Sequence, residues 1–368
     1  MTRLLLLVLS LWFSGQANAH KASDSFIYVH ADQIRVDIAL QDMQRLLNFD
    51  FNRDQSLSWG ELRAGESQFR SLLRSNISLA SRGVDCPILF RLEGLSQHSD
   101  GKYAVWILDA ACLHEKGPIA FSYSLLFELD PLHRALLAVN IGSKQHLQRV
   151  ASAYDDDKVQ LSVLSPGDNR VVLGEVSALD TAFKFAWEGV VHLLIGYDHL
   201  MFLLALLLPA SRRHGQSTLQ SAFSDVAWVV TMFTLAHSVT LVCASLGWIT
   251  LPSQPVEIGI ALSISVAAVL VLFDVNRRAQ RRLAMAVGLL HGLGFAGVLA
   301  GMLSTSPMKL LALGSFNLGI ELAQLGLVLL VLPLLHWLGA SLFYQRWLLP
   351  LTALGLALSG VFMAWQRL

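Results

Sequence analysis

Charged residues are scarce in this chain, and their scarcity argues against a wholly soluble protein. Asp, Glu, Lys and Arg make up 15% of the 368 residues, whereas an average soluble domain carries about 25%. Hydrophobic residues reach 54%, which is far too many for a disordered chain. The 27 basic residues balance the 27 acidic ones, so no surplus of positive charge points to a nucleic acid partner.

Cysteine is scarce as well, because the chain has only three. Cys243 is the single cysteine of the apolar C-terminal half, so a metal bound there would need imidazole or oxygen ligands instead of thiolates. Cys86 and Cys112 both lie in β-like segments of a part that we expect to be exported. An oxidising compartment favours a disulfide between them, with two free buried thiols as the alternative.

The first nineteen residues have the pattern of a secretory signal peptide. Arg3 supplies the positive charge, and the apolar stretch 4–13 is too short to cross a bilayer core of about 30 Å. Ala17 and Ala19 satisfy the small-residue rule for cleavage. We therefore expect residues 1–19 to be removed and residues 20–178 to be exported, with an uncleaved anchor as the alternative.

The exported part is rich in β-forming residues. Short runs of such residues are separated by Gly, Pro, Asp and Ser, a pattern typical of an antiparallel sandwich. The runs lie at residues 25–40, 86–92, 103–108, 119–129, 135–141 and 159–164. We therefore expect residues 20–178 to form a mostly-β, sandwich-like periplasmic domain.

One segment of that domain, residues 50–61, matches the loop of an EF-hand. In such a loop, oxygen ligands at positions 1, 3, 5, 7, 9 and 12 surround Ca²⁺. The matching residues are Asp50, Asn52, Asp54, Ser56 (through its carbonyl), Ser58 and Glu61. Amphipathic stretches at 40–49 and 61–73 flank the loop, but Gln55 stands where a glycine is usual. Calcium binding is the expectation, and a simple acidic helix–turn–helix is the alternative.

Residues 179–368 almost lack charge and predict a six-helix transmembrane domain. The expected spans are 187–208, 226–248, 256–273, 283–303, 310–338 and 346–366. Seven arginines lie in the loops after the first, third and fifth spans, whereas Lys309 and Arg367 alone lie on the other side. By the positive-inside rule, these arginines face the cytoplasm. We expect a multi-pass protein of the bacterial inner membrane with its N-terminal domain in the periplasm.

Ionisable groups are numerous inside these spans, although each costs at least about 2.5–3.5 kcal/mol at the membrane centre. His192 and His199 are two helical turns apart and share a face, with Asp198 about 100° round the helix. Other spans contribute His237, Glu257, His291, Asn317, Glu321 and Gln324, the last three along one stripe. At the middle of the membrane, imidazole and carboxylate groups suit nickel, zinc, cobalt or copper(II). Hydrogen bonding between helices is the alternative role.

Four blocks of this half resemble the HupE/UreJ family of membrane proteins, in its longer branch with an exported N-terminal domain. The blocks are His192-x5-Asp198-His199, residues 233–240, residues 288–296 and residues 316–324. The resemblance implies permeation of a transition metal, chiefly nickel for the maturation of metalloenzymes. It also implies that His192, Asp198 and His199 lead in metal binding, with Glu321 and Glu257 as further carboxylates.

Transport of a divalent transition metal across the inner membrane is therefore the expected function, with nickel first. The alternative is an intramembrane zinc hydrolase, in which three ligands hold the metal and Glu321 or Asp198 acts as general base. A third interpretation is a sensor or assembly protein whose exported domain binds a partner. The expected partners are the metal ion and the lipid bilayer, and a periplasmic partner protein or a homo-oligomer stays open.

Overall fold

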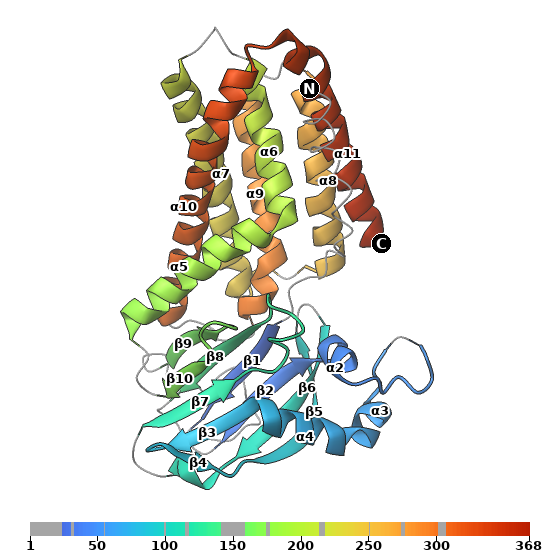
Figure 1. The fold of residues 1–368 in the computed structure, drawn as a ribbon, viewed down its shortest axis with the longest axis vertical. Helices are drawn as coiled ribbons and strands as arrows, with labels where there is room; N and C mark the ends of the chain where they lie inside the picture. The colour runs from blue at the N-terminus through green and yellow to red at the C-terminus, as the bar shows by residue number, and fades with distance from the viewer. Residues whose placement is uncertain are drawn as a thin grey trace.

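The computed structural model describes most of the chain and places a β-rich domain at one end of a helical bundle (Figure 1). The described residues are 24–30, 33–54, 56–98, 101–114, 118–140, 159–173, 177–212, 218–249, 251–273, 277–300 and 307–368. The expected signal peptide, residues 1–19, lies outside them, as do Gln55 and Arg213.

The β-rich domain consists of two sheets. The larger has the strand order β5-β6-β2-β1-β8-β9 and the smaller β10-β7-β3-β4. The larger sheet contains β1 (Asp24–Val29), β2 (Ile34–Ala39), β5 (Leu89–His98), β6 (Gly101–Asp109), β8 (Arg134–Asn140) and β9 (Val159–Leu164). The smaller contains β3 (Ile77–Ser81), β4 (Val84–Cys86), β7 (Ile119–Tyr123) and β10 (Arg170–Leu173). The expected β-rich fold is confirmed, but β1 and β8 pair in parallel, unlike the antiparallel sandwich that we expected.

Both sheets contribute to one hydrophobic core, which includes Val36, Trp106, Phe121 and Leu137. The expected run at 25–40 is a hairpin of β1 and β2, and the run at 119–129 leaves the sheet after β7. Leu126 has a positive φ of 70°, a backbone conformation that a continuing strand does not adopt. Strands β3 and β10 were not predicted from the sequence because each has only four or five residues.

The helices of this domain are short. They are α2 (Leu40–Leu46), α3 (Trp59–Ala64), α4 (Glu66–Asn76) and the 3₁₀ turn η1 (Ala111–His114). Helix α4 is amphipathic and buries Phe69 and Leu73 in the core, as its apolar spacing predicts. Cys86 of β4 and Cys112 of η1 form a disulfide.

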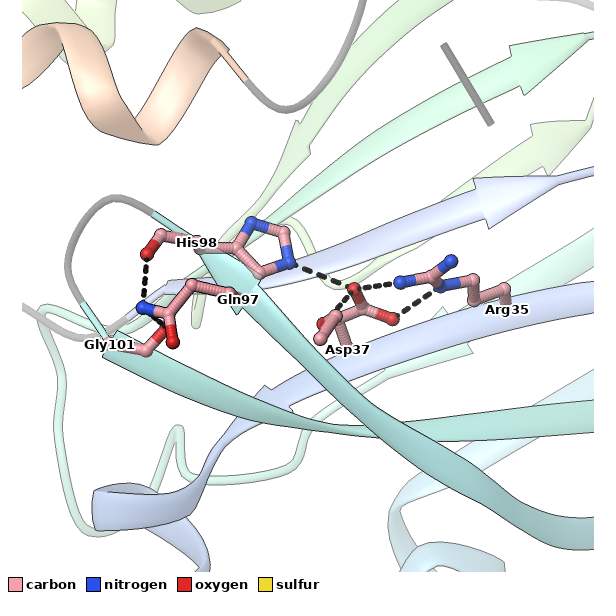
Figure 2. A network of polar contacts seen from close by, with 6 residues as sticks. Arg35, Asp37, Gln97, His98 and Gly101 are labelled. Atoms are coloured by element: carbon pink, nitrogen blue, oxygen red, sulfur yellow. Dashed lines mark hydrogen bonds and ion pairs between the residues drawn. The ribbon is translucent and has the colours of Figure 1, made fainter. Parts of the chain in front are cut away.

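The outer face of the larger sheet bears a network of polar side chains around Asp37, whose side chain is 0% exposed (Figure 2). Arg35 donates two hydrogen bonds to its carboxylate, at 2.7 and 2.6 Å. Ser96 and His98 donate to Oδ2 at 2.8 and 2.9 Å. The ring of His98 also stacks on Phe26, with 4.4 Å between centroids. The network therefore ties β2 to β5.

The helical half contains seven long helices within the described residues. They are α5 (Ala178–Ile195), α6 (Tyr197–Arg212), α7 (Leu219–Ser245), α8 (Ser253–Val271), α9 (Arg277–Ala300), α10 (Pro307–Leu338) and α11 (Leu349–Gln366), the last preceded by the π-helical turn η3 (Tyr344–Leu348). By length and apolar composition, α7, α8, α10 and η3–α11 can each cross a membrane. The bent pair α5–α6 makes a fifth candidate. Six spans therefore stay a prediction, with α9 in question.

The first expected span, 187–208, is broken rather than continuous. Helices α5 and α6 meet at Gly196 and are bent by 72°. Gly196 has φ −67° and ψ 94°, outside the helical region. Helix α5 consequently lies across the end of the bundle, next to the β-rich domain (Figure 1). One side of α5 exposes Leu179, Phe183 and Trp187, which are 83%, 75% and 58% exposed.

The other side of α5 joins the two halves of the molecule. Thr181 donates to the Leu161 carbonyl at 2.8 Å, and Arg134 pairs with Glu188 at 2.9 Å. A single hydrophobic cluster contains sheet residues such as Phe26 together with Phe316 of α10. The outer face of the larger sheet is therefore packed against the helical half instead of facing solvent along its whole surface.

Candidate metal centre

Four histidines from four helices meet beside the α5–α6 break. His199, near the start of α6, lies at the centre of the group. Its ring centroid is 4.9 Å from that of His192 on α5, 5.0 Å from that of His291 on α9 and 6.4 Å from that of His237 on α7. The structure thus brings together all four intramembrane histidines that the sequence analysis proposed as ligands.

Glycines make this approach possible. A Cβ at Gly196 would lie 2.6 Å from Nδ1 of His199 and 2.9 Å from the His192 carbonyl oxygen. On α9, Gly288 and Gly292 lie against α7, where a Cβ would collide with the carbonyl oxygens of Phe233 and His237. The small-residue spacing in this span predicts such close helix contact. The contact sets His291, next to Gly292, against α7.

The ring nitrogens of the cluster are unusual for buried groups. Both nitrogens of His199, His237 and His291 are buried and have no hydrogen-bond partner among the described residues. An unsatisfied buried polar group costs roughly 1–3 kcal/mol, a cost that a ligand bound by these imidazoles would offset. A hydrogen-bonding role between helices, the alternative in the sequence analysis, does not match these three rings. Neutral imidazole nitrogens are suitable ligands for nickel, zinc or copper(II).

The expected carboxylates Asp198 and Glu321 have partners other than these rings. Asp198 forms an ion pair with Arg367 at the end of α11, with 2.8 Å between Oδ2 and Nη2. The Arg367 guanidinium also donates to the backbone carbonyl of Glu257, at 2.8 Å. From the sequence, Arg367 bears only on the orientation in the membrane and is not predicted to lie near the site. Its one signal was a cation directly after the last apolar stretch.

Two residues of the polar stripe on α10, Glu321 and Gln324, are hydrogen-bonded to α7. Thr231 donates to Oε1 of Glu321 at 2.5 Å, and Thr234 donates to Oε1 of Gln324 at 2.7 Å. Asn317 donates to the Leu313 carbonyl within its own helix at 2.9 Å. Threonines 231 and 234 were not proposed as site residues, although Thr234 precedes His237 by one helical turn.

His237 and Glu321 differ in depth along the bundle. His237 is eight residues before the end of α7 at Ser245, which corresponds to about 12 Å at 1.5 Å per residue. Glu321 is fourteen residues after the start of α10 at Pro307, or about 21 Å. The cluster thus lies near the end of the bundle that faces the β-rich domain.

The rings are close but not in ligating positions. Among the residues that the structure describes, no three His, Cys, Asp or Glu side chains are arranged to hold a metal ion. Two nitrogens bound to one tetrahedral zinc at 2.0–2.1 Å lie about 3.3 Å apart, so the rings would have to turn toward a common centre. The ligand set His192, Asp198, His199, His237, His291 and Glu321 therefore stays a prediction, of which the structure gathers the histidines.

Polar side chains of the loop at 50–61 form hydrogen bonds within the loop. Asp54 accepts from the N–H and hydroxyl of Ser56, and these bonds hold the pKa of Asp54 below its usual value. Glu61 accepts from the Ser58 hydroxyl at 2.6 Å and from the Phe51 N–H at 2.9 Å. Its pKa is lowered, chiefly by Ser58. The Glu61 carboxylate, at the last position of the loop, thus contacts the backbone of its second position. The EF-hand stays a prediction.

Apolar helices with polar groups inside, joined to a β-rich domain, define a multi-pass membrane protein. The sequence model of the HupE / UreJ protein family matches residues 168–367, which is more than half of the 368 residues. The chain therefore belongs to the HupE/UreJ family, as its four blocks predicted. No curated protein matches the chain, and no solved structure does so either.

Proposed function

We propose that this protein transports a divalent transition metal ion across the membrane, with nickel as the first candidate. The carrying observation is the cluster of four histidines from four helices, three of which have buried ring nitrogens without hydrogen-bond partners among the described residues. Membership of the HupE/UreJ family supports the same function. A transported ion must be bound and released, and a site that closes only around the ion meets both needs.

The path proposed for the ion begins at the broken helix. Discontinuous helices mark the ion sites of many transporters, because unwound backbone there can face the ion. His192 and His199 flank the α5–α6 break and would meet the ion first, followed by His237 and His291. Further along α7, Thr231 holds Glu321, which supplies negative charge deeper in the bundle.

Six spans are the topology proposed for this path. Helix α9 packs closely along α7 through Gly288 and Gly292, so it follows a membrane-crossing helix over much of its length. The β-rich domain and the end of α11 then lie on the same side, the periplasmic side of a bacterial inner membrane. The expected arginine asymmetry supports this orientation.

Calcium is assigned to the loop at 50–61 on separate grounds. The spacing of its oxygen-bearing residues matches an EF-hand, and Asp50 and Asp54 are linked, since the Asp54 N–H donates to Asp50 at 3.0 Å. The Glu61 carboxylate lies across the same loop. In this position calcium would stabilise the domain and not take part in transport.

The transport proposal is tested by His199→Ala, with His336→Ala as a matched control on α10 outside the cluster. Elemental analysis of the purified protein and nickel uptake by expressing cells are the two measurements. His199→Ala removes the central ring and should abolish metal content and uptake. His336→Ala should leave metal content and uptake unchanged. Full metal content and uptake in His199→Ala would refute the proposed site. Tightly retained zinc in wild-type protein without uptake would favour the intramembrane hydrolase instead.

A further inference from the structure

Arg367 joins three helices beside the histidine cluster. Its guanidinium pairs with Asp198 at the start of α6 and donates to the Glu257 carbonyl at the start of α8, each at 2.8 Å. Its own carbonyl accepts from Gln254 Nε2 at 3.1 Å. A single residue at the end of α11 therefore fixes the positions of α6 and α8 relative to each other.

This ion pair adjoins the cluster along the chain. Asp198 directly precedes His199, the central ring, whose centroid lies 5.0 Å from that of His291. The two paired side chains are 20% and 19% exposed, so water reaches them only in part. The second oxygen of Asp198, Oδ1, is buried and has no hydrogen-bond partner among the described residues. The carboxylate is thus only half satisfied by Arg367.

A divalent metal ion that enters the cluster must be balanced by negative charge. The histidines are neutral ligands, so a divalent ion among them needs negative charge nearby, and Asp198 is the adjacent carboxylate. Two cations on one carboxylate repel each other strongly where the surroundings are partly desolvated. The ion and the guanidinium therefore compete for Asp198.

We infer that Arg367 is a built-in counter-ion of Asp198, which the metal ion displaces as it binds the histidine cluster. The inference rests on the proposed function. In the metal-free protein, Arg367 keeps the carboxylate compensated and holds the end of α11 on α6 and α8. Metal binding frees that end, and the return of Arg367 to Asp198 lowers the affinity and helps the ion to leave.

Metal titration of the purified full-length protein tests this displacement. The variants are Arg367→Gln, the conservative Arg367→Lys, and Arg346→Gln in η3 as a matched control at a different helix terminus. Without its competitor, nickel should bind Arg367→Gln roughly tenfold more tightly than wild type, a change of the size that second partners of metal ligands produce. Arg367→Lys should lie between the two, and Arg346→Gln should match wild type.

Thermal unfolding provides a second readout. Arg367→Gln should lower the melting temperature of the metal-free protein, because it removes an ion pair and a helix contact. Nickel should then raise the melting temperature more in this variant than in wild type, because ligand stabilisation grows with affinity. In an Asp198→Asn background, Arg367→Gln should change the affinity no further, since the competition requires the carboxylate. This last comparison also separates displacement from a general loosening of the fold.

The possible outcomes are distinct. Unchanged or weaker nickel binding in Arg367→Gln, with binding intact in wild type and lost in His199→Ala, overturns the displacement and leaves the proposed function standing. An equal effect of Arg367→Gln with and without Asp198 overturns it as well. Wild-type protein that binds no nickel, zinc, cobalt or copper overturns both proposals.

Discussion

At Gly196, a side chain would enter the cluster from the backbone. Any Cβ there would lie 2.6 Å from Nδ1 of His199, closer than atoms normally approach. The ring of His199 would therefore have to turn away from its neighbours. The absence of a side chain at this residue thus leaves room for the central histidine beside the break between α5 and α6.

Gly196→Ala should consequently weaken metal binding by roughly tenfold or more, since ligand orientation is worth that much. Gly326→Ala on α10 is the matched control, because nothing lies within 4 Å of its added Cβ. Titration with nickel, with expression and melting temperature measured in parallel, compares the two. Equal affinities for both variants would show that the cluster tolerates a displaced His199.

Asp37 shows how a buried charge is kept ionised on the outer face of the larger sheet. Burial by itself would raise the pKa of this carboxyl. Hydrogen bonds from His98, Arg35 and Ser96 and the charge of Arg35 outweigh burial, so the pKa lies below its usual value of 3.8. A lowered pKa in the folded state means that the stabilisation is present above about pH 4 and is lost as the pH falls through the folded-state value.

Asp37→Ala should therefore lower the stability at pH 7 by about 3–5 kcal/mol, the typical result of leaving the partners of a buried charge unpaired. The effect should diminish below pH 4, where wild type itself loses the contribution. Thermal unfolding of the full-length protein between pH 3 and pH 7 measures both. Asp109→Ala, at the end of β6, is the control, and a pH-independent difference from wild type would contradict the assignment.

At the scale of elements, the helices that could be predicted are those marked by a local pattern in the sequence. The apolar stretches gave α8, α10 and α11 to within three residues at each end, whereas α7 begins seven residues before its expected start. The α5–α6 break was missed because the composition stays apolar across Gly196, and a single glycine in an apolar helix does not by itself indicate a bend of 72°. That break, which composition does not reveal, places His192 beside His199.

The loop at 50–61 is the proposed calcium site. Calcium bound only by the folded state raises stability by about RT ln(1 + [Ca²⁺]/Kd). Calcium should therefore raise the melting temperature of the β-rich domain in the full-length protein. Asp50→Ala combined with Glu61→Ala should abolish the rise, whereas Asp85→Ala with Glu93→Ala, two acids outside the loop, should preserve it. A rise that persists in the loop variant would mean that calcium binds elsewhere.

At the scale of the whole molecule, the contacts that could not be predicted join side chains that are far apart in the sequence. The histidines could be proposed as a group because polar groups are costly in a membrane. The partner of Asp198 could not, because Arg367 is 169 residues away along the chain. The attachment of the larger sheet to α5 and α10 was equally hidden, since Phe26 and Tyr28 look like ordinary core residues in sequence. Their cluster with Phe316 became visible only in three dimensions.

The number of spans determines on which side of the membrane each part lies. With six spans, counting the bent pair α5–α6 as one and α9 as another, the β-rich domain and Arg367 are expected on the same side of the membrane. The arginines that follow α6 and open α9 then face the cytoplasm. Reporter fusions after Arg213 and after Leu368 should therefore report opposite sides of the membrane. Reporters on the same side would place Asp198, at the start of α6, and Arg367 on opposite sides of the bilayer, which is incompatible with their ion pair and contradicts the proposed path.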